Sequence, residues 1–204
     1  MQDGTIPPEL HEKYIGVVLN ETDRLTKLTN SLLTLNNLNT QGMILDRTNF
    51  DINPVIKNTA ASFEGTCRSK FITIELVLTG EQMYVNADMV KIQQVLYNLV
   101  DNAIKYTPKG STIRICAMNE NGKAKIQVED NGPGICDEMK PHIFEMFYTG
   151  KNTIADSHRS LGLGLALCRS IIEVHNGKLV LEDNTPHGCI FSFTLPLSEV
   201  TLNE

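Results

Sequence analysis

One amphipathic segment indicates both the fold and the chemistry of this chain of 204 residues: QQVLYNLVDNAIKYT, residues 93–107. Helical geometry, at about 100° per residue, predicts a helix over residues 88–106 with one apolar face. That face carries Ile92, Leu96, Leu99 and Ala103. A second face, roughly 130° away, carries Asn98, Asn102 and Lys105. The first face is typical of a protein core, and the second places two carboxamides and an amine in one row.

The two asparagines are unusual in the middle of a helix, because their side chains compete with the backbone for hydrogen bonds. A carboxamide oxygen is a hard, neutral ligand that suits Mg²⁺, which takes one or two protein oxygens and completes its shell with phosphates and water. Lys105 would offset phosphate charge. A solvated helix face explains this segment equally well, so the segment alone does not decide between the two hypotheses.

A second motif, DNGPGI at residues 130–135, directly follows a predicted strand, KAKIQVED. Asp130 ends that strand, where its carboxylate can accept a hydrogen bond from a purine amino group. Gly132 and Gly134 let the backbone approach a ring or adopt a positive φ. The alternative is an ordinary turn, since Asn-Gly and Pro-Gly are common turn dipeptides.

A third motif, RSLGLGLAL at residues 159–167, leads into a predicted helix from Gly164 to His175. Small residues at a helix start leave free N–H groups and a positive dipole end, which together bind phosphate. The motif matches neither the Walker pattern nor a complete dinucleotide fingerprint. The polar stretch from residue 149 to 160 is expected to close over a nucleotide as a lid, or else to be a mobile surface loop.

Composition excludes several classes of protein. The net charge is −6, without the Lys/Arg cluster that a nucleic-acid binder needs, so we expect no nucleic-acid partner. No run of roughly 18 apolar residues could span a bilayer. The cysteines are scattered, odd in number and without a CxxC pair: Cys67, Cys116, Cys136, Cys168 and Cys189. This pattern argues against a disulfide framework and a zinc site, and favours a reduced, intracellular, globular protein with mostly buried thiols.

The first fifty residues predict a long helix that opens at Pro7-Pro8 and ends near Gly42. Its residues recur at coiled-coil spacing: His11, Tyr14, Val18, Glu21, Leu25, Leu28, Leu32 and Leu35. A helix of about 30 residues spans roughly 45 Å and cannot bury a leucine seam against itself. We expect the seam to meet a second copy of the chain, giving a homodimer, or a segment absent from this sequence. The alternative is packing on its own globular domain.

The remaining segments predict an α+β fold: a two-layer sandwich with a mixed sheet and helices on one face, preceded by the coiled-coil-like helix. Asn53-Pro54 is a good N-cap with Pro at N1, starting a helix to about Ser69. Further helices are expected over 88–106, 137–147 and 164–175. Strands are expected over 71–78, 111–118, 123–130, 178–183 and 189–195. The predicted division is residues 1–48 for the helix and linker, 49–200 for the globular domain and 201–204 for a tail.

The order of the motifs carries a family resemblance. NxxxNxxKY (98–106), DNGPG after a strand, FEMFY (144–148) and GLGLAL resemble the N, G1, F and G2 boxes of the ATP-binding domain of bacterial sensor histidine kinases. Those kinases are GHKL ATPases, related to Hsp90, MutL and gyrase. The run LTNSLLTLNNL is similar to the second helix of the kinase dimerisation and phosphotransfer hairpin. The resemblance extends over residues 10–196.

The resemblance implies roles for individual residues. Asn102 would bind Mg²⁺, with Asn98 and Lys105 near the ATP phosphates as catalytic residues. Asp130 would bind the adenine amino group, with Tyr106 by the base or ribose. Other implied nucleotide-site residues shape the adenine pocket, anchor or form the lid, or present N–H groups to phosphates. They are Gly132, Gly134, Ile135, Phe144, Phe147, Lys151, Arg159, Leu161, Gly162, Leu163, Gly164 and Leu165.

The resemblance further implies an ATP-dependent protein-histidine kinase, cytoplasmic itself, whose parent is tethered to a membrane through an upstream region. Its phosphoryl group would pass to a response-regulator receiver domain. None of the histidines has the family's phosphoacceptor context: His11, His142, His158, His175 and His187. We therefore expect the acceptor on a preceding helix absent from this sequence.

Two departures from the family pattern leave other functions open. Ser160 replaces the first G2 glycine, and Tyr148-Thr149 stands where the F box usually continues with Arg. The alternatives are another GHKL enzyme, such as an anti-sigma serine kinase, and a non-catalytic, nucleotide-binding or phosphatase-biased module. The leucine-seam helix argues against the serine kinase.

Overall fold

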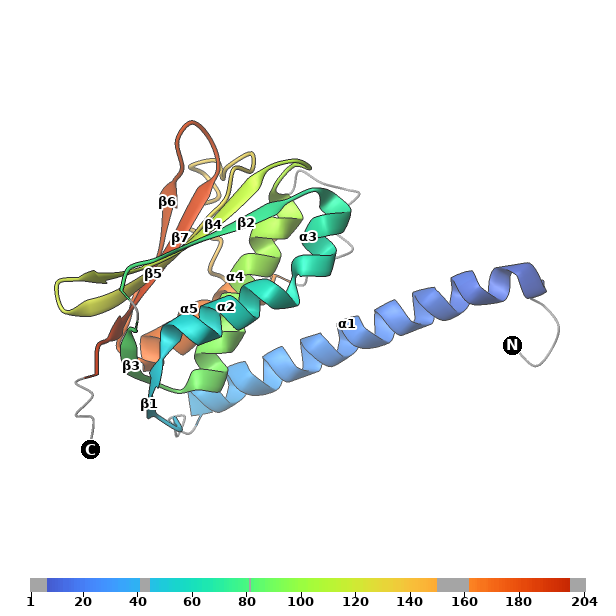
Figure 1. Ribbon diagram of the computed structural model, residues 1–204. Helices are drawn as coiled ribbons and strands as arrows, with labels where there is room; N and C mark the ends of the chain where they lie inside the picture. Colours follow the sequence, from blue (N-terminus) through green and yellow to red (C-terminus); the bar gives the residue numbers. More distant parts are fainter. Residues whose placement is uncertain (1–6, 41–44, 81, 150–161, 199–204) are drawn as a thin grey trace.

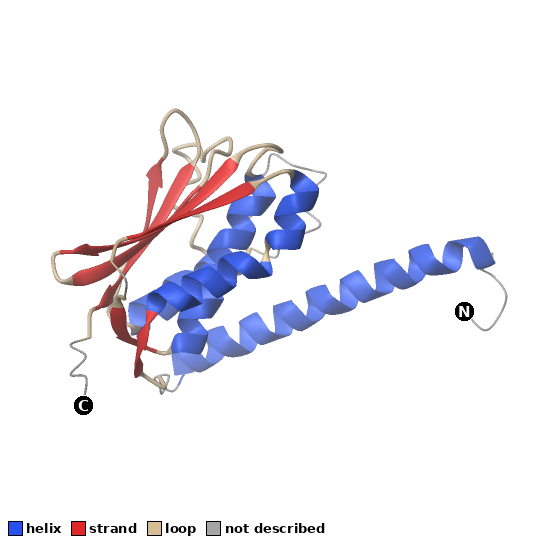
Figure 2. Cartoon of the chain, viewed as in Figure 1, coloured by secondary structure: helices blue, strands red, loops and turns tan. Residues whose placement is uncertain are grey.

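Five strands form the central sheet of the computed structural model, which describes residues 7–40, 45–80, 82–149 and 162–198. The strands are β2 (Thr73–Leu78), β4 (Thr112–Glu120), β5 (Lys123–Glu129), β6 (Leu179–Asp183) and β7 (Cys189–Pro196). Their order is β2-β4-β5-β7-β6. The β2–β4 pair is parallel and the other pairs are antiparallel, so the sheet is mixed as expected. Figure 2 shows its right-handed twist and the β4–β5 and β6–β7 hairpins at its opposite ends.

Helices cover one face of this sheet (Figure 1). They are α2 (Ile52–Ser62), α3 (Glu64–Lys70), α4 (Met89–Tyr106) and α5 (Gly164–Val174). The core face predicted for α4 is confirmed, because Ile92, Leu96, Leu99 and Ala103 are at most 4 % exposed. Strand side chains such as Ile113, Ile126 and Phe193 meet this face from the sheet and are 0–1 % exposed. The α+β sandwich is therefore confirmed.

The helix expected from Asn53 to Ser69 is wrong in two details. Its N-cap is Asp51, whose carboxylate Oδ1 accepts the Asn53 N–H at 3.1 Å and the Met83 N–H at 2.9 Å. The helix is also broken at Phe63, which has φ −98° and ψ 0° and separates α2 from α3. The Phe63 ring is buried against α4, with its centre 4.6 Å from the centre of the Tyr97 ring.

The helix predicted for residues 137–147 is absent, and a series of turns replaces it. The N–H groups of Met139, His142 and Glu145 bond carbonyls three residues back rather than four. Pro141 has no N–H to donate, which removes one bond from any helical ladder here. The structure also contains a two-stranded sheet that the sequence did not predict, β1 (Thr48–Asp51) with β3 (Tyr84–Ala87).

The N-terminal helix, α1, is present as predicted and spans Pro8–Thr40, while Gly42 lies outside the described residues. Its N-terminal half projects clear of the sandwich, and its other half lies beside α5 (Figure 1). The seam residues Tyr14 and Val18 are 43 % and 57 % exposed, whereas Leu28 packs against the core. Packing on the chain's own domain therefore covers only part of the seam. Within the described residues, no helix is long and apolar enough to cross a membrane.

Candidate functional site

The polar row of α4 lies at the border between core and solvent. Asp88 caps the helix, since its carboxylate accepts the Lys91 N–H at 3.1 Å. Asn98, Asn102 and Lys105 are all half-buried, unlike a fully solvated face. The Lys105 ammonium lies 5.5 Å from the centre of the Tyr106 ring. The row is therefore a partly desolvated strip of hydrogen-bonding groups, the kind of surface that a polar ligand can displace water from.

The start of α5 adjoins this row. A Cβ on Gly164, the first residue of α5, would lie 3.9 Å from the carboxamide carbon of Asn98. The N-cap residue is Leu163, and no side-chain capping hydrogen bond forms there among the described residues. Free N–H groups at the positive end of an 11-residue helix can bind an anion. The structure thus brings Asn98 of the first motif and Gly164 of the third together, as the sequence predicted.

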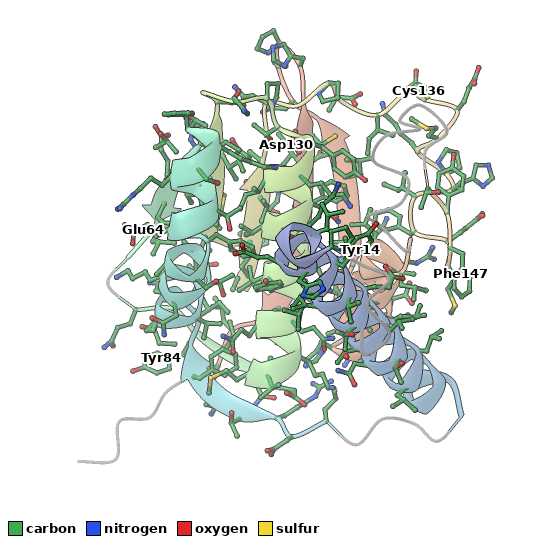
Figure 3. The ribbon with its side chains drawn as sticks, turned by 90° about the vertical axis from the view of Figure 1, so that its right-hand side faces the viewer. Tyr14, Glu64, Tyr84, Asp130, Cys136 and Phe147 are labelled. Carbon is green, nitrogen blue, oxygen red and sulfur yellow. The ribbon has the colours of Figure 1, made fainter. Side chains whose placement is uncertain are left out.

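Asp130, directly after β5, is 6 % exposed, and the two oxygens of its carboxylate differ in their hydrogen bonds. Oδ1 accepts the Gly132 N–H at 2.8 Å and the Cys189 N–H at 3.3 Å. No hydrogen bond to Oδ2 occurs among the described residues. Burial raises the pKa of this carboxyl above its ordinary value, while the two N–H donors act in the opposite direction. Such a carboxylate can accept a hydrogen bond from an amino group of a ligand through the oxygen that the protein does not bond. Figure 3 shows the position of Asp130 in the domain.

Two glycines let the motifs approach one another closely. A Cβ on Gly132 would lie 3.2 Å from the Tyr106 carbonyl oxygen, so the DNGPG loop packs on the end of α4. Gly162 has φ +65°, and a Cβ there would lie 2.6 Å from the Phe147 carbonyl carbon. The Phe147 N–H also donates to the Gly162 carbonyl at 2.9 Å. The FEMFY and GLGLAL segments are therefore in direct backbone contact.

A hollow of about 490 Å³ opens beside these contacts. Its walls are formed by Tyr106, Thr107, Pro108, Asn131, Gly132, Pro133 and His187. The Thr107 hydroxyl, buried next to it, has no hydrogen-bond partner among the described residues. Asn98 and Asn102 are not on this wall, so the hollow adjoins the DNGPG loop rather than the asparagine row.

The other predicted site residues divide into three groups. Gly134 (φ +77°) lies against Gly188, and Ile135 and Leu165 pack on the core. Phe144 packs on the core, with its ring centre 6.5 Å from that of Phe191 in an edge-to-face contact, whereas Phe147 is 61 % exposed. The lid that these two residues would anchor lies outside the described residues. Three predicted residues lie outside the described part of the chain: Lys151, Arg159 and Leu161.

The sequence missed the contacts made by the β6–β7 turn. His187 Nδ1 lies 3.0 Å from the Gly132 carbonyl oxygen, and Asn184 Nδ2 donates to the Asp130 carbonyl at 2.9 Å. These residues are more than fifty positions from the loop that they contact. In the sequence, Asn184 and His187 are recognisable only as residues of a turn that contains a proline and a glycine. Among the described residues, no group of three His, Cys, Asp or Glu side chains could hold a metal.

Comparisons with known proteins find a matching family, similar sequences and similar structures. A profile described as "Histidine kinase-, DNA gyrase B-, and HSP90-like ATPase" matches residues 87–199. "Sensor protein KdpD" of Clostridium acetobutylicum is 40 % identical over 123 residues, which are 60 % of this chain but 14 % of that protein, so this chain corresponds to a small part of it. The Acinetobacter baumannii histidine kinase AdeS superposes with a TM-score of 0.78, at 28 % identity over 96 % of this chain and 89 % of that one. Histidine kinase ThkA, in complex with the response regulator TrrA, gives a TM-score of 0.77 at 32 % identity, over 97 % of this chain and 55 % of that one.

Proposed function

Because this chain belongs to the histidine kinase-, DNA gyrase B- and HSP90-like ATPases, as the catalytic domain of a sensor histidine kinase, we propose that it binds Mg·ATP and phosphorylates a histidine. The acceptor would be a histidine on the other helix of the dimerisation hairpin, and that histidine is not part of this sequence. The observation that carries the proposal is the position of α4 between the two other motifs: Asn98 of its asparagine row adjoins the start of α5, and its C-terminal end at Tyr106 contacts the loop at Asp130.

The residues present fit the nucleotide and its cation. Asp130 would offer carboxylate Oδ2 to the adenine amino group, and the Tyr106 backbone lies next to Gly132 of the same loop. The N–H groups of Gly162, Leu163 and Gly164 would bind phosphates at the helix start. Asn102 would hold Mg²⁺, with Asn98 and Lys105 next to the phosphates. The bound cation would neutralise triphosphate charge.

Phosphoryl transfer of this kind depends on positioning and charge neutralisation. A nitrogen of the neutral imidazole forms the bond to the γ-phosphorus as the bond from that phosphorus to the β,γ-bridging oxygen breaks. ADP leaves with the electron pair, and the imidazole proton goes to solvent. An imidazole nitrogen is already nucleophilic near pH 7, so the chain needs no strong general base.

We propose the partners from two further observations. A structural neighbour is a histidine kinase in complex with its response regulator, which supports a receiver domain as the next phosphoryl acceptor. The exposed seam residues Tyr14, Val18 and Leu25 of α1 support a homodimer through this helix. Residues 49–200 would be the ATP-binding unit and residues 1–48 half of the dimerisation hairpin with its linker. The chain would be the cytoplasmic portion of a membrane-tethered sensor.

The proposal is tested by mixing the chain with Mg·ATP labelled at the γ-phosphate and a separately prepared hairpin that carries an acceptor histidine. We expect label on the hairpin that is lost in acid and kept in base, as for phosphohistidine. Asn102→Ala should abolish transfer, and Asn49→Ala, on the exposed β1–β3 pair, is the matched control. Acid-stable phosphoserine would favour an anti-sigma serine kinase, and ATP binding without transfer would favour a non-catalytic module.

A further inference from the structure

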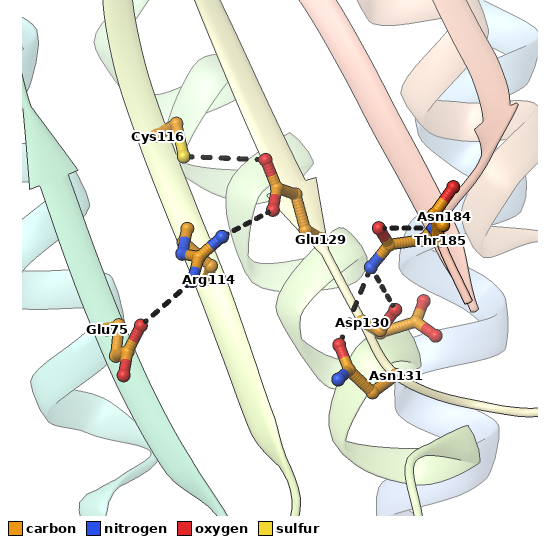
Figure 4. A network of polar contacts seen from close by, with 8 residues as sticks. All are labelled: Glu75, Arg114, Cys116, Glu129, Asp130, Asn131, Asn184 and Thr185. Atoms are coloured by element: carbon orange, nitrogen blue, oxygen red, sulfur yellow. Dashed lines mark hydrogen bonds and ion pairs between the residues drawn. The ribbon is translucent and has the colours of Figure 1, made fainter. Parts of the chain in front are cut away.

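The turn between β6 and β7 is bonded to three consecutive residues of the DNGPG loop, Asp130, Asn131 and Gly132. Figure 4 shows the contacts of Asn184 with the first two of them. Asn184 Nδ2 donates to the Asp130 carbonyl at 2.9 Å and lies 3.5 Å from the Asn131 side-chain oxygen. His187 Nδ1 donates to the Gly132 carbonyl at 3.0 Å. The two side chains thus bond the backbone on both sides of Asn131.

The turn is itself held in a defined shape. The Asn184 N–H donates to the Gly188 carbonyl at 3.1 Å, and the Asn184 side-chain oxygen accepts the Thr185 N–H at 2.8 Å. At the base of the turn, the Asp130 N–H donates to the Cys189 carbonyl at 2.9 Å. Asn184 therefore bonds the turn and the loop at once.

These bonds determine where the Asp130 carboxylate points. Its Oδ1 is held by the N–H groups of Gly132 and Cys189. Gly132 is fixed from its other side by His187, and Cys189 continues from the turn that Asn184 closes. Both N–H donors of the carboxylate consequently depend on the turn, and so does the direction of the remaining oxygen, Oδ2.

We infer that Asn184 and His187 are positioning residues for recognition of the nucleotide base, acting through the Asp130 loop. This inference rests on the proposed ATP binding and adds a specificity-determining element to it. Neither side chain needs to touch the nucleotide. Their loss leaves the phosphate site at α5 intact and lets Oδ2 turn away from the amino group that distinguishes adenine from guanine at that position.

A second hairpin of the same sheet supplies a matched control. In the β4–β5 turn, the Asn119 side-chain oxygen accepts the Gly122 N–H at 3.2 Å. This asparagine also stabilises a hairpin turn, but it bonds nothing in the DNGPG loop. Asn119→Ala therefore removes an equivalent turn contact without disturbing Asp130.

The experiment measures binding of Mg·ATP, Mg·GTP and magnesium tripolyphosphate to the full chain by calorimetry. The variants are Asn184→Ala, His187→Ala, the double variant and Asn119→Ala. One hydrogen bond contributes about threefold to ten-fold in affinity, so the double variant should bind ATP at least about ten-fold more weakly and lose a similar share of its ATP-over-GTP preference. Tripolyphosphate binding should stay unchanged, and Asn119→Ala should match the wild type throughout.

Two results would overturn the inference while leaving the proposed function in place: an unchanged ATP-over-GTP preference, or an equal loss for ATP and tripolyphosphate, which a general structural defect would give. If the wild-type chain binds no ATP, both the inference and the proposed function are contradicted. If the double variant does not fold, the same binding measurements on Asn184→Ala and His187→Ala test the inference. His187→Gln, which keeps an N–H donor, should recover part of the affinity that His187→Ala loses.

Discussion

Substitution of Gly188 by alanine tests how closely the β6–β7 turn must approach the DNGPG loop. Gly188 has φ +116°, and a Cβ there would lie 1.9 Å from the Asp130 carbonyl oxygen and 3.0 Å from the Asn131 Cα. Both neighbours are backbone atoms, so no side chain can turn aside. The turn and the loop must separate, and the bonds that Asn184 and Cys189 make across this contact must lengthen or break.

The cost can be estimated from two contributions. A side chain at this backbone conformation costs about 1–3 kcal/mol, and forcing an extra methyl into a packed contact costs about 1–3 kcal/mol more. The free energy of unfolding should therefore fall by about 2–6 kcal/mol. ATP affinity should fall as well, by more than about ten-fold, because the Asp130 carboxylate loses the Cys189 N–H donor and the loop loses its bonds to Asn184.

The matched control is Gly122→Ala in the β4–β5 turn. Gly122 has φ +76° with nothing within 4 Å of its Cβ position, so only the backbone cost of about 1–2 kcal/mol applies. Urea unfolding of both variants gives the difference in stability, and calorimetry gives the ATP affinity. Equal stability losses, or wild-type ATP affinity in a folded Gly188→Ala variant, would refute the close contact between turn and loop.

Three further predictions concern other parts of the domain. Gly162→Ala, whose Cβ would meet the Phe147 backbone, should weaken Mg·ATP binding measured by calorimetry, whereas Gly110→Ala, with φ +81° and open space, should not. Asp88→Ala removes the α4 N-cap and should lower the free energy of unfolding in urea by about 1 kcal/mol. Burial lowers the pKa of His175 below 6.5, so the unfolded chain takes up a proton first as the pH falls. Stability should decrease from pH 7 to pH 5, and His175→Gln should flatten that decrease; an unaltered slope would contradict the assignment.

The direction of the His175 effect follows from its two hydrogen bonds. Nε2 lies 3.0 Å from the Asp88 N–H and must accept from it, so Nδ1 carries the proton and donates to the Ile171 carbonyl at 2.7 Å. Protonation of Nε2 would place its N–H opposite the Asp88 N–H, two donors facing each other in a fully buried site. The nearby charges are Arg47, which lowers the pKa further, and Asp88, which raises it.

Local patterns were sufficient to predict the elements that surround the site. The apolar face of α4 is long enough to identify a helix, and its row from Asn98 to Lys105 follows from the same periodicity. The Asn-Gly pair at Asn121 and Gly122 has positive φ at both residues, as the predicted hairpin requires. These features depend on residues within a few positions of one another.

Features that depend on distant residues could not be predicted. The N-cap at Asp51 is selected because the same carboxylate also binds Met83, thirty-two residues later. The turns at 137–147 contain apolar residues at helical spacing, but Pro141 and packing of Phe144 on β7 override that pattern. Asn184 and the Asp130 loop are 54 residues apart, and only the pairing of the strands in the sheet brings them together.

Calorimetric titration of Mg·ATP into the wild-type chain and the Asp130→Asn variant tests the central claim most directly. The asparagine keeps an oxygen for the Gly132 and Cys189 N–H groups and places an NH₂ donor where Oδ2 was, the atom proposed to accept from the adenine amino group. We predict one nucleotide bound per wild-type chain and at least about ten-fold weaker binding to the variant, because a buried donor would then face a donor. No heat of binding to the wild type, or equal affinity for both proteins, would contradict an adenine nucleotide site at Asp130.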